Sequence, residues 1–120
     1  MEQLTIFDLI PSDEPFEGKT IEQIVTEISI LVGIYFKPKV WEWDDHQTVE
    51  YVAKLGKKDQ LTIEEDFYQT RDEKNGQRFI GVEYTFGLAG GGCPCDSIDE
   101  AVQYLKRRKT EYYDRFTNKQ

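Results

Sequence analysis

The side chains that could catalyse a reaction or bind a metal ion are few in this 120-residue sequence. His46 is its only histidine, and Cys93 and Cys95 are its only cysteines. His46 follows two aspartates, but no nucleophile or set of metal ligands accompanies it in the sequence. One histidine and two cysteines supply at most three ligands, short of a closed zinc site. We therefore expect no enzyme activity, no metal ion and no cofactor.

A run of glycines precedes the last predicted helix. Gly90, Gly91 and Gly92 could hold an anion at that helix N-terminus. They lack the Gly-Lys-Ser/Thr sequence of a phosphate-binding loop. Glycine also serves wherever a chain must bend freely. We interpret the Gly-rich stretch from Gly87 to Gly92 as a flexible loop between a strand and a helix.

Two amphipathic helices are predicted, each after a capping box. Thr20 with Gln23 and Ser97 with Glu100 have the residue types and spacing of that motif. Helical spacing then places apolar residues on one face of each helix. The first stripe comprises Ile21, Ile24, Val25, Ile28, Leu31, Val32 and Tyr35, and the second comprises Ile98, Ala101, Val102, Leu105, Tyr112 and Phe116.

The region between the helices has the alternation of β-strands. Residues 39–43 favour an extended backbone, since they contain Val40 and both tryptophans. Residues 48–55 fit either a strand or a short helix, and we favour the strand because residues 56–59 suit a hairpin turn. Asn75-Gly76 is a second turn signal. Residues 48–87 therefore read as an antiparallel meander.

These elements predict one α+β domain over residues 20–116, preceded by an N-terminal arm over residues 1–19. We expect three or four antiparallel strands with both helices on one face of the sheet. The element order resembles that of the double-stranded-RNA-binding domain. That family grips phosphates with a lysine-rich start to its last helix, whereas residues 97–100 here read Ser-Ile-Asp-Glu. The resemblance therefore does not imply RNA binding.

The net charge of −8 is unevenly distributed along the chain. Residues 1–50 contain 3 basic and 11 acidic residues, and residues 51–120 contain 12 of each. An acidic protein repels nucleic acid phosphates, and it suits a basic partner or simply a soluble surface. The absence of a long apolar run and of a secretion signal predicts a cytoplasmic protein without membrane contact.

Size and acidity resemble those of phage anti-CRISPR and anti-restriction proteins that imitate DNA. The resemblance implies that carboxylates stand where phosphates stand in the basic channel of a host nuclease. Glu64, Glu65 and Asp66 alternate on a strand, so the three are not expected to converge on one site. The candidate acidic surface comprises Glu42, Asp44, Asp45, Glu64, Glu65 and Asp66.

The most specific motif is Gln3-Leu4-Thr5-Ile6-Phe7. It resembles the pentapeptide Gln-Leu-x-Leu-Phe by which bacterial proteins dock on the DNA polymerase sliding clamp, with Ile6 in place of a leucine. The resemblance implies that Leu4, Ile6 and Phe7 enter an apolar pocket and that Gln3 forms hydrogen bonds at its edge. The alternative is that these residues form an edge strand or pack on the core of the domain.

Two further surfaces are candidates for binding. Trp41 and Trp43 share one face of their predicted strand, either as exposed binding residues or as core. A basic cluster near Tyr112 and Tyr113 suits phosphates and bases, or it serves the helix dipole and pairs within the helix. This cluster comprises Lys106, Arg107, Arg108 and Lys109.

The sequence thus predicts a non-catalytic binding protein of a phage or mobile element that engages host DNA-processing machinery. Docking on the sliding clamp through residues 3–7 is the leading hypothesis. A DNA-mimicking inhibitor of a defence nuclease is the first alternative. A nucleic-acid-binding accessory protein that uses residues 106–109 is the second.

Overall fold

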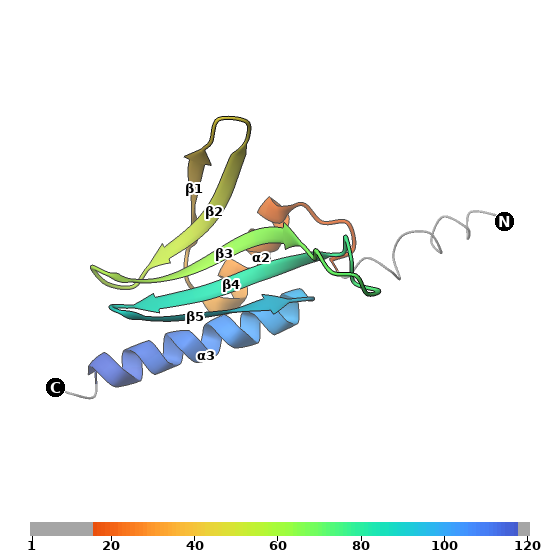
Figure 1. Ribbon diagram of the computed structural model, residues 1–120. Coiled ribbons are helices and arrows are strands. Elements are labelled where there is room, and N and C mark those ends of the chain that lie inside the picture. Colours follow the sequence, from red (N-terminus) through yellow and green to blue (C-terminus); the bar gives the residue numbers. More distant parts are fainter. Residues whose placement is uncertain (1–15, 118–120) are drawn as a thin grey trace.

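The computed structural model describes residues 16–117 as two helices and a five-stranded sheet (Figure 1). All neighbouring strands are antiparallel, in the order β1-β2-β3-β4-β5. The α+β class and the meander are therefore confirmed. The sheet has five strands, where three or four are expected from the sequence. The elements are α2 (Ile21–Val32), β1 (Lys37–Glu42), β2 (Gln47–Lys54), β3 (Asp59–Phe67), β4 (Arg78–Phe86), β5 (Ala89–Cys95) and α3 (Ile98–Thr117).

One face of the sheet, the covered face, carries the core. Tyr51, Ile63, Val82 and Cys93 lie in register across β2 to β5 and point to this face. Both helices pack against it and share one hydrophobic cluster with the strands. Removing this much apolar surface from water is the main stabilising term of the fold. No element within residues 16–117 covers the other side of the sheet, which is called the open face (Figure 1).

The first helix begins and ends as its sequence indicates. The Thr20 hydroxyl accepts a hydrogen bond from the Gln23 amide, and the Gln23 side chain accepts one from the Thr20 amide. Gly33 ends the helix in the left-handed conformation at φ 79°. The predicted apolar stripe is too wide, because Leu31 is 48% exposed and Tyr35 is 73% exposed. Leu31 lies in the last turn of α2 and Tyr35 follows the helix, whereas Val32 and Phe36 beside them are buried.

The hairpin of β1 and β2 projects from the rest of the sheet (Figure 1). Residues 48–55 form a strand, as favoured. The β2–β3 pairing begins only at Glu50 opposite Glu64, so residues 47–49 of β2 pair with β1 alone. Asp44 and Asp45 form the hairpin turn, which is closed by a hydrogen bond from the Trp43 amide to the His46 carbonyl oxygen. Both faces of the hairpin tip are exposed.

The prediction of a flexible loop over residues 87–92 is wrong. Gly87 at φ 65° and Leu88 form a tight turn, and Ala89–Cys95 form β5, which pairs with β4 throughout. The glycines make room for neighbouring side chains: a Cβ on Gly92 would lie 2.8 Å from the Glu83 Cγ, and one on Gly91 would lie 3.0 Å from the Tyr84 ring. The glycine run is therefore a strand and not an anion-binding loop.

The folded domain begins before Thr20. Phe16 is 1% exposed in the core, and the Lys19 amide donates a hydrogen bond to its carbonyl oxygen. Lys19 also forms an ion pair with Glu27 at 2.8 Å. Residues 16–19, placed in the arm by the sequence, thus contribute to the domain. Among the described residues, no helix is long and apolar enough to span a membrane.

Candidate binding surface

Four carboxylates lie together on the open face and are called the acidic face. Glu50 of β2 stands directly opposite Glu64 of β3, and Asp66 follows two residues along the same strand. Glu83 of β4 points to the same side one row away, opposite Thr62. None of the four forms an ion pair within residues 16–117. Lys39, opposite Glu50 in register, lies instead over the Trp41 ring at 4.4 Å.

The charges of the acidic face repel one another. The pKa of Glu64 is raised, first because partial burial disfavours its charged form and then because Glu50, Glu83 and Asp66 are near. Like charges directly opposite each other across two strands destabilise a sheet. The folded chain therefore holds negative charge at a place where its own stability would favour a neutral residue.

A groove of about 710 Å³ opens where the β1–β2 hairpin leaves β3. Trp41 and Trp43 line it from the hairpin, together with carboxylates from α2, β2 and β3. We call it the indole groove. Its lining residues are Ile21, Glu22, Trp41, Trp43, Gln47, Thr48, Val49, Glu50, Tyr51, Glu64, Glu65 and Asp66.

Both tryptophans are accessible to a partner. Trp41 is 43% exposed and Trp43 is 55% exposed, so the alternative that they form core is wrong. The Trp43 indole donates a hydrogen bond to the Thr48 hydroxyl at 3.1 Å and stacks with His46 at 5.9 Å between ring centroids. These contacts hold the Trp43 ring while leaving much of its surface exposed.

Beside the groove, the open face has a depression whose lining includes two glycines, Gly81 and Gly92, as well as Pro94 and Phe79. Gly81 and Pro94 continue the row of Glu50 and Glu64 across β4 and β5, and Gly92 lies opposite Glu83. The space above them is about 360 Å³. The acidic face therefore borders a depression that another chain can approach closely.

The predicted acidic surface is only partly one surface. Glu64 and Asp66 belong to the acidic face, whereas Glu65 points to the covered face and pairs with Arg78 at 2.6 Å. The three still line one groove, because β3 has no β2 partner beyond Glu64 and both of its faces are accessible there. The expectation that they cannot converge was too strict.

The remaining predicted acids lie on the hairpin. Glu42 points to the opposite side from Trp41 and accepts a hydrogen bond from Gln47 at 2.9 Å. Asp44 and Asp45 occupy the hairpin turn, where Asp45 contacts His46 at 2.5 Å. Sequence reasoning missed Glu50 and Glu83 as site residues. Pairing residues outward from the turn at residues 56–59 places Glu50 opposite Glu64, so the sequence contained a signal for Glu50.

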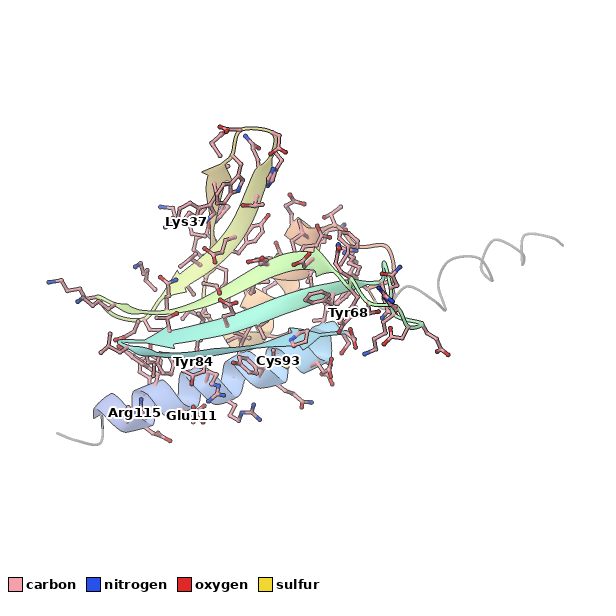
Figure 2. The ribbon with its side chains drawn as sticks, in the orientation of Figure 1. Lys37, Tyr68, Tyr84, Cys93, Glu111 and Arg115 are labelled. Carbon is pink, nitrogen blue, oxygen red and sulfur yellow. The ribbon has the colours of Figure 1, made fainter. Side chains whose placement is uncertain are left out.

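The basic cluster of the last helix does not form one patch. Lys109 reaches α2, where its ammonium donates a hydrogen bond to the Val32 carbonyl oxygen at 2.9 Å. Arg108 pairs with Glu111 at 2.8 Å and lies over the Tyr84 ring at 4.3 Å. Figure 2 shows Tyr84 and Glu111 on the side of the sheet occupied by α3. Lys106 and Arg107 are exposed.

The candidate catalytic and metal-ligating groups stay apart. His46 lies at the exposed hairpin turn, and Cys93 and Cys95 are free thiols on β5, with Cys93 labelled in Figure 2. Burial and then the neighbouring Cys93 raise the pKa of Cys95 to about 12. Within residues 16–117, no three His, Cys, Asp or Glu side chains group as metal ligands would.

Residues 3–7 lie outside the described residues, so their docking role stays a prediction from the sequence.

No family model, curated protein or solved structure matches this chain.

Proposed function

We propose that this chain is a non-catalytic binding protein whose acidic face docks on a basic surface of a protein partner. The observation that carries this proposal is the row of like charges formed by Glu50 and Glu64. A chain maintains a repulsive arrangement of this kind at a cost in stability. The cost is offset when a partner supplies the missing positive charge.

Nucleic-acid-binding channels of DNA-processing enzymes are protein surfaces with the required chemistry. They are lined by lysine and arginine, because these residues replace the counterions of phosphate groups. An acidic sheet face that occupies such a channel would exclude nucleic acid. This mode of action supports the hypothesis of a DNA-imitating inhibitor or accessory protein from a phage or mobile element. We prefer that hypothesis to clamp docking as the role of the domain.

A competition experiment tests this mode of action. The purified chain, immobilised on resin, is mixed with bacterial lysate and washed at low salt. We expect captured proteins to be eluted both by duplex DNA and by a rise to about 0.5 M salt, since screening weakens contacts between exposed charges. Retention of every captured protein in the presence of excess DNA would argue against a nucleic-acid channel as the target.

Clamp docking is a second and compatible function, supported by the sequence of the arm. Gln3, Leu4, Ile6 and Phe7 match the positions that the pentapeptide needs, and they precede Phe16, the first described residue, by nine positions or more. Changing Leu4 and Phe7 to alanine should abolish capture of purified sliding clamp, because buried apolar anchors supply most of the affinity of short peptides. Thr5→Ala, at the variable position, is the matched control and should bind as the unaltered chain does.

The basic helix supports nucleic-acid binding less well. Arg108 and Lys109 already serve contacts within the fold, which leaves Lys106 and Arg107 for phosphates. Two exposed cations on a chain of net charge −8 give weak electrostatic attraction to nucleic acid.

A further inference from the structure

The indole groove combines features that the acidic face alone does not have. Two indole rings and five carboxylates line it, and no lysine or arginine does among the described residues. The carboxylates come from three separate elements: Glu22 from α2, Glu50 from β2, and Glu64, Glu65 and Asp66 from β3. A cationic group placed there would meet aromatic faces and negative charge together.

Both long walls of the groove are strand edges without a ladder partner. Residues 47–49 of β2 pair only with β1, and residues 65–67 of β3 pair only with β4. The Asp66 carboxylate accepts a hydrogen bond from the Phe67 amide at 2.8 Å, which satisfies one group of the β3 edge. An extended peptide can pair with the backbone groups of such edges. The groove shape therefore suits an extended segment and not a compact ligand.

The chemistry of the lining favours arginine over lysine. A guanidinium group stacks on aromatic rings and forms two parallel hydrogen bonds with a carboxylate, whereas an ammonium group is a strongly hydrated point charge. The chain uses this combination elsewhere: Arg108 lies over Tyr84 at 4.3 Å while it pairs with Glu111 at 2.8 Å. Lys39 over Trp41 shows that an indole of this groove accepts a cation.

We propose that the indole groove binds an arginine side chain carried by an extended segment of the partner protein. The proposal rests on the proposed function and adds the residue type and the place of its anchor. Trp41 and Trp43 supply aromatic faces, and Glu64 and Asp66 supply the carboxylates. The N-terminal segment of the chain itself is a poor occupant, because residues 1–15 contain four acidic residues and no basic residue.

Tryptophan fluorescence reports on this groove selectively, because the chain has only two tryptophans and both line it. The purified full chain is titrated at low salt with three blocked hexapeptides that alternate alanine with arginine, lysine or citrulline. Citrulline has the shape of arginine without its charge. We expect a saturable emission change with the arginine peptide, at least fivefold weaker binding of the lysine peptide, and no response to the citrulline peptide.

Two single-charge variants locate the binding. Glu64→Gln, inside the groove, should weaken binding of the arginine peptide about fivefold. Glu73→Gln removes the same charge from the exposed loop between β3 and β4, outside the acidic face and outside the groove lining, and it should change the affinity less than twofold. Circular dichroism of each variant checks that the fold is retained.

The outcomes separate this proposal from the proposed function. Equal affinity for the arginine and lysine peptides would overturn the assignment of arginine. Equal weakening by both variants would show that the peptide responds to net charge alone, and it would overturn the groove as the binding place. The groove proposal is also refuted if neither cationic peptide binds. The proposed docking function is tested separately. It fails only if neutralising the acidic face leaves the capture of partner proteins unchanged.

Discussion

At the scale of residues, the negative charge of Glu64 lowers the stability of the fold, whereas the proposed function requires it. Its pKa is higher in the folded chain than in the unfolded chain, for which burial is the first cause and Glu50 the second. Between those two pKa values the folded chain binds more protons. The free energy of unfolding therefore falls as pH rises through this window.

Glu64→Gln should stabilise the chain at pH 7. The substitution keeps the shape of the side chain and removes the repulsion, so we expect the free energy of unfolding to rise by roughly 0.2–1 kcal/mol. Urea denaturation at several pH values measures this. The difference from the unaltered chain should shrink as the pH falls through the raised pKa of Glu64, because the unaltered side chain then becomes neutral as well. A variant that is less stable at pH 7 would show that Glu64 makes a favourable contact instead.

The two cysteines should differ in reactivity, because thiolates and not thiols react with disulfide reagents. Cys95 is 1% exposed and its pKa is about 12, whereas Cys93 is partly exposed. At pH 8 we expect one thiol to react with an aromatic disulfide reagent in the native chain and the second only after denaturation. Cys93→Ser should remove the fast reaction. Two equally fast thiols in the native chain would contradict the buried position of Cys95.

At the scale of elements, the sequence was sufficient to predict both helices and most of the strands. The Thr20 capping box, Gly33 and the turn at residues 56–59 are local signals, because each depends on neighbours in the chain. The β5 strand has no such signal. Glycine has low strand propensity, and Gly91 and Gly92 are favoured there only because Tyr84 and Glu83 of the neighbouring strand lie over them.

Gly92→Ala should be destabilising if the run is a strand. The added Cβ would lie 2.8 Å from the Glu83 Cγ and 3.1 Å from the Val82 carbonyl oxygen, so we expect a loss of about 1 kcal/mol or more. Thermal denaturation measures it. In a Glu83→Ala background the loss should be smaller, because one of the two contacts is gone. Leu88→Ala in the exposed turn is the control and should be nearly neutral. In a flexible loop Gly92→Ala would instead be neutral or stabilising.

At the scale of the whole molecule, the distribution of charge along the chain does not describe its distribution in space. The excess of acid lies in residues 1–50, yet the acidic face takes Glu64, Asp66 and Glu83 from the balanced half. Register across β2, β3 and β4 brings these carboxylates together, and a count along the sequence does not contain register. The same holds for the indole groove, which depends on the divergence of the hairpin from β3.

The central claim is that the acidic face binds the partner. The most direct measurement compares two variants with the same net charge in capture from bacterial lysate. One neutralises the acidic face by Glu50→Gln, Glu64→Gln, Asp66→Asn and Glu83→Gln. The other neutralises four exposed acids elsewhere by Glu17→Gln, Glu73→Gln, Asp99→Asn and Asp114→Asn. Among the proteins that duplex DNA and salt elute from the unaltered chain, we expect the first variant to lose those that the second keeps. Equal retention by both variants would contradict the claim.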